Sequence, residues 1–200
     1  MLPGIFLAAG KGKRFGSQKL TYPFKNEPLI VRGLRSCIQS ELNEIIVVLG
    51  YESDKVKKVI EEYFSGNKKL RIIINNDFSK GMISSFNSGL EILDREAKGV
   101  MMILADMPFI SSSAINKLIE SWNGDEMIIP EVNGSYTHPR IIPSCLFPAF
   151  LELDQFNSGK DVLSKNRDKI KTVIFENGEE FMDIDTKNDL IKFLPDAKGV

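Results

Sequence analysis

The chain of 200 residues has few of the side chains that a zinc site requires. It contains one histidine, His138, and two cysteines, Cys37 and Cys145, which lie far apart and fit no metal-ligand spacing. Because zinc sites are built mainly from nitrogen and sulfur ligands, we expect none here. A catalytic metal would then be a hard ion held by carboxylates, such as Mg2+.

The chain also lacks a surplus of charge, with 26 basic and 27 acidic residues and a formal net charge of -1. Proteins that bind nucleic acids or anionic membranes usually carry a basic surplus, so we expect neither partner. The apolar stretch at residues 5–9 is too short for a signal peptide, and no run approaches the roughly 20 apolar residues of a membrane span. These absences predict a cytoplasmic protein with reduced thiols.

Short apolar runs alternate with amphipathic segments over the first two-thirds of the chain. The apolar runs predict strands at residues 5–8, 45–49, 70–74, 100–105 and 127–129. Helical spacing predicts helices at residues 28–40, after Ser53, at 83–95 and after residues 111–113. Pro28 would occupy the first turn of the first helix, where proline is favoured. This β-α-β order predicts one α/β domain with three αβα layers and a mainly parallel, mixed sheet.

The pattern changes after residue 130. Asn133 and Gly134 predict a hairpin between the strand at 127–129 and a strand around residues 138–142. Further along, we expect a helix at 161–165, a strand at 172–175 and a last helix starting at Thr186. Thr186 and Asp189 have the spacing of an N-terminal capping box.

A loop rich in glycine and cations follows the first predicted strand, with the sequence AGKGKRFGSQK at residues 9–19. Its glycines allow close approach of the backbone to an anion, and its four cations suit a triphosphate: Lys11, Lys13, Arg14 and Lys19. The spacing excludes a Walker A loop. Because Phe15 stands between Gly12 and Gly16, the dinucleotide fingerprint is also imperfect, although a nicotinamide cofactor and a merely solvated loop both stay open.

The longer string LAAGKGKRFGSQKL, at residues 7–20, resembles the LAAGxGxRxGxxKL signature of nucleotidyltransferases related to molybdenum cofactor cytidylyltransferase. The resemblance continues along nearly the whole chain and implies a Rossmann-like nucleotide-diphospho-sugar transferase fold. It implies that Arg14 and Lys19 are catalytic and hold the triphosphate. The nucleotide-binding residues that it implies in this loop are Leu7, Ala8, Ala9, Gly10, Gly12, Arg14 and Lys19.

Three aspartates follow predicted strands or extended segments. Asp106 follows the strand at 100–105, at the sheet edge where open α/β folds bind ligands. Its string LADMP matches the family motif whose aspartate coordinates the metal, which implies a catalytic, metal-binding role for Asp106, although a capping role toward residues 111–113 stays open. The string DIDTKNDL contains Asp183 and Asp185 and resembles the family's DIDTPEDL, in which one aspartate completes the metal site. The residues alone do not decide between Asp183 and Asp185, although we favour Asp183 slightly, and helix capping could account for part of this acidity.

The segment GMISSFNSGL, at residues 81–90, resembles the family's GMxxSxxxGL, which lines the nucleobase pocket. The resemblance implies that Gly81, Met82 and Ser85 bind the nucleotide, whereas the residues alone also allow the serines to cap a helix. The guanylyl relatives typically carry LAGG and PLAG where this chain has LAAG and GM. This difference favours CTP over GTP.

The acceptor side departs from the family pattern. SYTHPRI resembles a GHP motif with Thr137 in place of glycine, and NSGK replaces a GDxGAR-like motif. The matching positions imply that His138, Gly159 and Lys160 bind the acceptor. We therefore expect residues 1–130 to bind the nucleotide, and residues 131–200 to form the acceptor side and supply the second metal carboxylate, within a single domain.

The resemblance implies transfer of CMP from CTP to a phosphorylated acceptor, most simply molybdopterin, with Mg2+ as cofactor and release of pyrophosphate. Transient contact with a molybdoenzyme would follow from that acceptor. Three alternatives stay open: a guanylyl- or cytidylyltransferase for a sugar or polyol phosphate, an NADP-dependent reductase, and a non-catalytic module that carries a cofactor.

Overall fold

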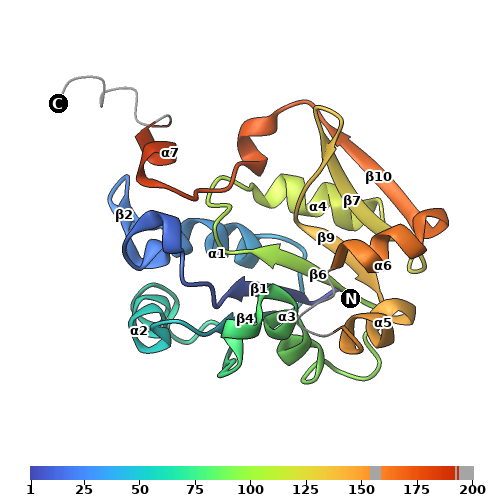
Figure 1. Ribbon diagram of the computed structural model, residues 1–200, viewed down its shortest axis with the longest axis horizontal. Helices are drawn as coiled ribbons and strands as arrows, with labels where there is room; N and C mark the ends of the chain where they lie inside the picture. The colour runs from blue at the N-terminus through green and yellow to red at the C-terminus, as the bar shows by residue number, and fades with distance from the viewer. Residues whose placement is uncertain (154–158, 192, 194–200) are drawn as a thin grey trace.

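The computed structural model describes residues 1–153, 159–191 and 193, and it has the predicted three-layer α/β architecture (Figure 1). The main sheet has eight strands in the order β10-β7-β9-β6-β1-β4-β5, with β8 paired to β7. Its strands are β1 (Gly4–Ala8), β4 (Ile45–Leu49), β5 (Leu70–Ile74), β6 (Gly99–Leu104), β7 (Met127–Val132), β8 (Ser135–Tyr136), β9 (Arg140–Pro143) and β10 (Ile170–Phe175). The short strands β2 (Pro23–Phe24) and β3 (Glu27–Pro28) form a separate hairpin.

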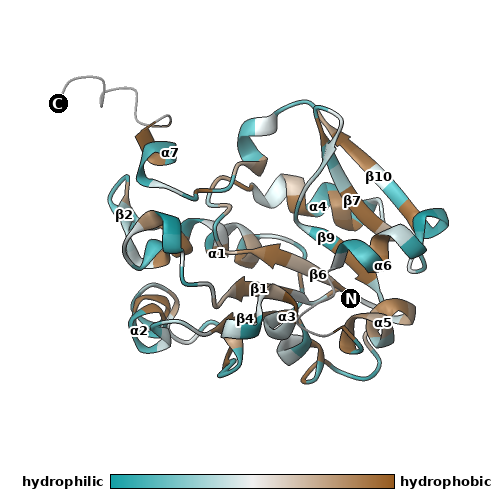
Figure 2. Cartoon of the chain, viewed as in Figure 1, coloured by the Kyte–Doolittle hydropathy of each residue, from teal (hydrophilic) through white to brown (hydrophobic). Residues whose placement is uncertain are grey.

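The helices cover both faces of the sheet. They are α1 (Leu29–Gln39), α2 (Ser53–Phe64), α3 (Met82–Leu90), α4 (Ser112–Glu120), α5 (Phe147–Leu151), α6 (Gly159–Lys165) and α7 (Lys187–Ile191). Residues of α1, α2 and α4 pack on one face, and residues of α3, α5 and α6 pack on the other. Figure 2 shows the resulting pattern, with hydrophobic strands enclosed between helices.

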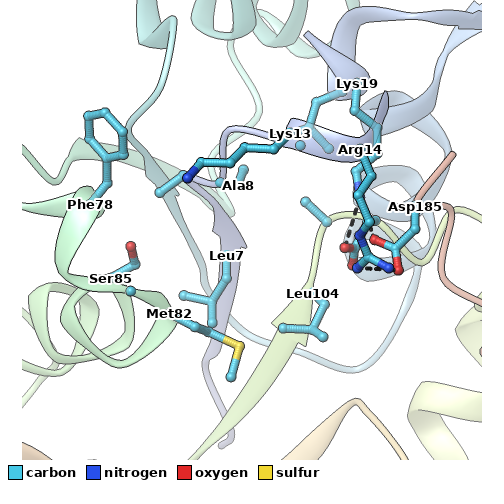
Figure 3. Close-up of a pocket in the computed structure, with 17 residues that line it drawn as sticks. Leu7, Ala8, Lys13, Arg14, Lys19, Phe78, Met82, Ser85, Leu104 and Asp185 are labelled. Carbon is cyan, nitrogen blue, oxygen red and sulfur yellow. Dashed lines mark hydrogen bonds and ion pairs between the residues drawn. The ribbon is translucent and has the colours of Figure 1, made fainter. Parts of the chain in front are cut away.

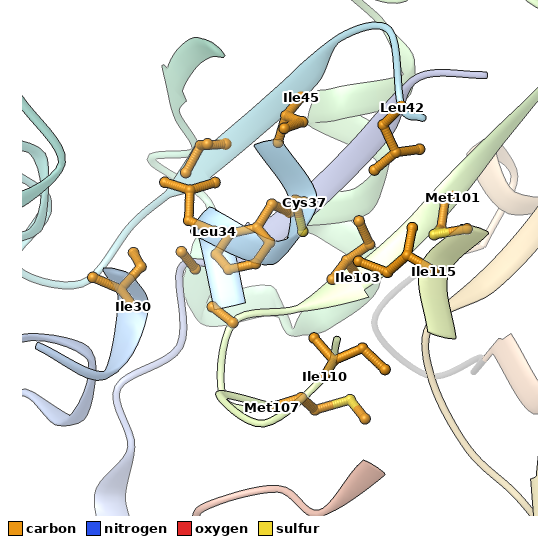
Figure 4. Close-up of a cluster of buried hydrophobic side chains, with 14 of the residues drawn as sticks. Ile30, Leu34, Cys37, Leu42, Ile45, Met101, Ile103, Met107, Ile110 and Ile115 are labelled. Atoms are coloured by element: carbon orange, nitrogen blue, oxygen red, sulfur yellow. The ribbon is translucent and has the colours of Figure 1, made fainter. Parts of the chain in front are cut away.

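Burial on both faces explains why the central strands are continuous apolar runs. In β1, Phe6 belongs to the core cluster on one face, while Ile5 and Leu7 belong to the cluster on the other. Figure 4 shows the first of these clusters, in which Leu34 and Cys37 of α1 pack beside Ile103 of β6. Burial raises the pKa of the Cys37 thiol to about 12, so this free cysteine stays protonated at neutral pH.

The predicted hairpin turn forms, and β7 pairs with two strands that follow it. Asn133 and Gly134 both have positive φ, of 49° and 75°, as a two-residue hairpin turn requires. The chain therefore returns at once as β8, which pairs with the end of β7. The expected partner around residues 138–142 is β9, which begins at Arg140 and is antiparallel to β7 on one side and to β6 on the other.

Two helix boundaries also differ from the sequence prediction. The helix expected at 83–95 is α3, which ends at Leu90. Beyond it the Asp94 side chain accepts a hydrogen bond from the Glu96 backbone, a local turn that competes with helix. Pro28 lies in β3 with ψ of 145°, so α1 begins after it rather than on it.

The capping box is confirmed, because Asp189 accepts from the Thr186 backbone at 2.8 Å and Thr186 Oγ1 accepts from the Asp189 backbone at 3.3 Å.

The connection of the parallel strands creates a crevice at one edge of the sheet. From β1 the chain moves to β4 and β5 on one side, then returns to β6 on the other side of β1. The loops that follow β1 and β6 therefore diverge at the carboxyl ends of these two strands, and open α/β sheets bind ligands at such a position. Within the described ranges, every helix is too short or too polar to cross a membrane.

Two helical glycines provide a test of the packing between layers. A Cβ at Gly89 would lie 2.8 Å from Ile5 Cγ2, whereas a Cβ at Gly33 would approach nothing closer than the Met107 carbonyl oxygen at 3.4 Å. We predict that Gly89→Ala lowers the free energy of unfolding by about 1–2 kcal/mol, because α3 must move away from β1. Gly33→Ala should leave it unchanged or raise it, since alanine favours helix. Urea denaturation measures both, and a Gly89→Ala protein as stable as Gly33→Ala would contradict the prediction.

Candidate functional site

A cavity of about 380 Å³ lies at the carboxyl ends of β1 and β6, beside the start of α3 (Figure 3). Every residue predicted to bind the nucleotide lines it, from Leu7 in the first strand to Ser85 in α3. Its lining residues are Leu7, Ala8, Ala9, Gly10, Gly12, Lys13, Arg14, Lys19, Leu20, Phe78, Gly81, Met82, Ser85, Leu104, Ala105, Asp106 and Asp185.

Glycine conformations and a buried phenylalanine shape the loop after β1. Gly12 and Gly16 have φ of 55° and 79°, in the left-handed region that other residues rarely adopt. Between them Phe15 is 2% exposed and packs with Ile184 and Leu190 from the end of the described chain. The residue that interrupts the dinucleotide glycine spacing is thus the anchor of this loop.

A buried glutamine also fixes the loop. Gln18 donates through Nε2 to the Tyr51 carbonyl at 2.9 Å and accepts through Oε1 from the Leu20 backbone at 3.2 Å. A Cβ at Gly10 would meet nothing within 4 Å. The loop is therefore held at its far end, while its backbone at Gly10 stays accessible from the cavity.

Two cations and two carboxylates form one connected group at this end of the cavity. The Lys19 side chain is 9% exposed, and its Nζ lies 3.0 Å from Asp106 Oδ2 and 3.7 Å from Asp185 Oδ1. Arg14 lies 2.8 Å from Asp185 Oδ2. A lysine so buried needs partners of opposite charge, and the two aspartates supply them.

Asp185 reaches this group because the segment before α7 is tied to the loop after β6. The Ile184 backbone donates to the Asp106 carbonyl at 2.8 Å, and the Ile184 side chain is fully buried. Asp185 lines the cavity, whereas Asp183 does not. Burial raises the pKa of Asp183, and the negative charges of Asp185 and Asp106 raise it further, so the three carboxylates share one electrostatic environment.

The arrangement fits a hard divalent cation. Asp106 Oδ1 is buried and has no hydrogen-bond partner among the described residues, while its Oδ2 faces Lys19. A buried carboxylate oxygen without a donor is costly unless a cation binds it. In the part of the chain that is described, no three His, Cys, Asp or Glu side chains gather as a complete metal site. Mg2+ commonly takes only one or two carboxylates and completes its shell with substrate phosphates and water.

The family model that describes the MobA-like NTP transferase domain matches residues 4–170, most of the chain and all of the cavity except Asp185. The chain belongs to this family. It is therefore a nucleotidyltransferase, as the resemblance of the first loop implied.

Three characterised relatives show how varied the proteins similar to this MobA-like transferase are. The purine catabolism protein PucB of Bacillus subtilis is 29% identical over 150 residues, which cover 74% of this chain and 73% of PucB. The molybdenum cofactor cytidylyltransferase of Escherichia coli is 26% identical over 188 residues, which cover 94% of this chain and 92% of that enzyme. Nicotine blue oxidoreductase of Paenarthrobacter nicotinovorans is 24% identical, and the match covers 96% of this chain and 95% of that protein.

Solved structures agree in fold. The crystal structure of Rv0371c from Mycobacterium tuberculosis superposes with a TM-score of 0.82 at 18% identity, over 97% of this chain and 98% of that one. The same protein in complex with manganese gives a TM-score of 0.72 at 15% identity, over 88% of each chain.

The opposite end of the cavity in this MobA-like transferase is lined mainly by apolar side chains, although Lys13 reaches toward it, and sequence reasoning missed part of it. Phe78 packs on Gly50, where a Cβ would lie 2.6 Å from the Phe78 Cβ. Figure 3 shows Phe78, Met82 and Ser85 on one side of the cavity and Arg14, Lys19 and Asp185 on the other. Phe78 belongs to no motif, and only its position shortly after the carboxyl end of β5 could have indicated it.

The three residues predicted to bind the acceptor lie outside this cavity. Lys160 lines a second cavity of about 460 Å³ together with Arg140 and Arg167. Gly159 begins α6, where an added Cβ would come within 3.5 Å of Ile83 and Phe150. Arg140 was not among the predicted site residues, although a charged residue at the start of an otherwise apolar strand was a signal for it.

His138 is mostly buried in the loop before β9 and has a hydrogen bond with the Met102 backbone. Burial lowers its pKa to about 3, and the nearby positive charge of Arg140 contributes to this shift. The imidazole is therefore neutral at pH 7.

We predict that stability falls in mild acid because of His138. Below pH of about 6.5 the unfolded chain takes up a proton at this residue, whereas the folded chain does not until the pH nears 3. The contribution of His138 to the free energy of unfolding is fully present above pH 6.5, and it falls by about 1.4 kcal/mol for each pH unit below 6.5.

Urea denaturation at pH 7 and pH 5 measures this loss. His138→Gln should lose about 2 kcal/mol less than the wild type between these two values. His138 is the sole histidine, so no other imidazole contributes to the difference between the two proteins. The carboxylates are common to both proteins, and their contributions cancel in the comparison. Equal losses in the two proteins would show that His138 is not the cause.

Proposed function

We propose that the protein transfers CMP from CTP to a phosphorylated acceptor, with molybdopterin as the favoured acceptor, and releases pyrophosphate. The observation that carries this proposal is a single cavity with a charged end built from Lys19, Asp106 and Asp185 and an apolar end that contains Ser85. A triphosphate with its metal fits the first end, and a nucleobase fits the second. The cytidylyltransferase among the relatives supports the choice of reaction.

The charged end would hold the phosphates. Arg14 and Lys19 both line the cavity, and they would bind the β- and γ-phosphates and offset the negative charge of the departing pyrophosphate. Asp106, together with Asp183 or Asp185, would hold Mg2+, which supplies positive charge against the phosphate oxygens when it is bound. The manganese complex of a structural neighbour supports a divalent metal in this fold.

The proposed reaction is an in-line displacement at the α-phosphate. An oxygen of the acceptor phosphate forms a bond to the α-phosphorus, and the bond from that phosphorus to the bridging oxygen of pyrophosphate breaks. Because a phosphate nucleophile is already anionic, no side chain has to remove a proton. The contribution of the protein is then to position the two substrates and to neutralise the charge that accumulates on the phosphates.

The choice of CTP rests on the base end of the cavity. Ala9, Gly81 and Met82 line it and differ from the motifs typical of the guanylyl relatives. A guanylyltransferase, or a transferase for a sugar or polyol phosphate, would use the same charged end with a different base or acceptor. The relative named as an oxidoreductase favours a nicotinamide-dependent reductase as second candidate, but the carboxylates beside Lys19 have no evident use in pyrophosphate binding by a dinucleotide fold.

We predict that Asp106→Asn abolishes pyrophosphate release from CTP in the presence of Mg2+ and a phosphorylated acceptor. The amide keeps the size of the side chain but loses the charge that a metal requires, so the rate should fall on the order of 100-fold or more. Asp125→Asn, a change at an exposed aspartate outside the cavity, should have no effect. A coupled pyrophosphate assay measures the rates, and urea denaturation checks the fold.

The same assay with a panel of triphosphates tests the choice of base. Fast release with GTP and slow release with CTP would overturn the cytidylyl assignment and keep the class of enzyme. Binding of a nicotinamide cofactor without any requirement for a divalent metal, and no pyrophosphate release, would favour the reductase.

Residues 131–200 would form the acceptor side, with His138, Gly159 and Lys160 as the proposed acceptor residues. Of these, Lys160 shares its cavity with Arg140 and Arg167, and none of the three cations has an ion pair to a described residue. Arg140 is also tied to the loop that carries His138, because its Nε donates to the Thr137 carbonyl at 2.8 Å. An anionic part of the acceptor suits this cavity, and a molybdopterin acceptor would bring transient contact with a molybdoenzyme.

We predict that Lys160→Gln raises the KM for the acceptor about tenfold, because a hydrogen bond to a charged group is lost. The dissociation constant for CTP should not change, since Lys160 lies outside the nucleotide cavity. Lys165→Gln, at the other end of α6, is the matched control and should change neither value. Steady-state kinetics with varied acceptor decides the matter, and equal effects of the two substitutions would remove Lys160 from the acceptor site.

A further inference from the structure

Asn75 is a buried polar residue at the carboxyl end of β5 that no sequence motif identified. It is 5% exposed, and its backbone donates to the Leu49 carbonyl at 2.8 Å. Its side-chain oxygen accepts from the Asp77 backbone at 2.8 Å. Because a backbone N–H can only donate, this contact fixes the amide, and the NH2 group must face the other way.

The NH2 group of Asn75 faces two serines of α3. Nδ2 donates to Ser84 Oγ at 3.0 Å and to Ser85 Oγ at 3.1 Å. Both hydroxyl oxygens are therefore acceptors toward Asn75, and each hydroxyl proton must be directed elsewhere.

The two serines differ in where that proton can go. Ser84 donates to the Asp77 carbonyl at 3.1 Å and does not line the cavity. Ser85 is 3% exposed and lines the cavity, and over the described residues its hydroxyl donates to no protein group. A buried donor without an acceptor is costly, so the Ser85 proton is available to a ligand in the cavity.

We propose that Asn75 is a positioning residue that keeps the Ser85 hydroxyl proton directed at an acceptor atom of the nucleobase, a ring nitrogen or a carbonyl oxygen. This inference rests on the proposed nucleotidyltransferase function. It assigns the contact to the base because Ser85 lies with Phe78 and Met82 at the apolar end, across the cavity from Arg14 and Asp185 (Figure 3). Cytosine presents such acceptors at its O2 and N3 atoms.

Asn75→Asp tests the proposal by reversing the polarity of one group. One carboxylate oxygen can still accept from the Asp77 backbone, while the other replaces the NH2 group and captures the Ser85 proton. The probes are CTP with Mg2+ and inorganic tripolyphosphate with Mg2+, both measured by calorimetry. Tripolyphosphate has no base, so the ratio of the two dissociation constants removes any general effect of the added negative charge on phosphate binding.

We expect Asn75→Asp and Ser85→Ala each to raise the ratio of the CTP to the tripolyphosphate dissociation constant about threefold to tenfold, as for one lost hydrogen bond. The double variant should show no further loss, because both changes remove the same donor. Ser84→Ala is the matched control and should leave the ratio unchanged. Asn75→Ala, which captures no proton, should raise the ratio less than Asn75→Asp, and it carries the test if Asn75→Asp does not fold.

Several results would overturn the proposal. If Ser85→Ala raises the ratio while Asn75→Asp and Asn75→Ala do not, Asn75 does not set the direction of the proton. If Ser85→Ala leaves the ratio unchanged, Ser85 does not contact the base. A wild-type protein that binds neither CTP nor tripolyphosphate would instead refute the proposed function itself, and the inference with it.

Discussion

The buried ammonium group of Lys19 is the feature on which the rest of the site depends. It lies between the carboxylates of Asp106 and Asp185, which come from the carboxyl end of β6 and from the segment before α7. Three segments distant in the sequence are thereby brought together by charge. A buried cation is stable only with such partners, and the same partners suit a divalent metal beside a triphosphate.

Hydrophobic packing holds these charged groups in place. Phe15 from the first loop and Ile184 from the C-terminal segment share one small core cluster, and the Ile184 backbone is hydrogen-bonded to Asp106. Arg14 lies next to the buried Phe15, Lys19 lies next to Gln18, and Asp185 lies next to Ile184. Asp106 is itself hydrogen-bonded to Ile184. Rigid support of this kind places the charges before any ligand arrives, which is what catalysis by positioning requires.

The cavity combines two chemistries at opposite ends. The charged end is built from loop residues, whereas the opposite end, where we propose that the base binds, is built from β1, β6 and the first turns of α3. At that end one hydroxyl group, Ser85, supplies a polar contact, and Asn75 gives it a direction. The family match establishes a nucleotidyltransferase, while recognition of base and acceptor depends on details that vary among relatives 24–29% identical to this chain.

The sequence by itself determined the class of fold and predicted most of the residues that line the main cavity. Buried parallel strands produce continuous apolar runs, and a loop that must approach phosphates needs glycine and cations at fixed spacing, so both leave local signals. Hydrogen bonding between distant segments leaves none. Only the tertiary structure showed that Asp185 rather than Asp183 faces the cavity, that β9 inserts antiparallel between β6 and β7, and that the Asn75 amide donates to Ser85. These outcomes depend on which strands become neighbours, and that is decided by packing of the whole sheet.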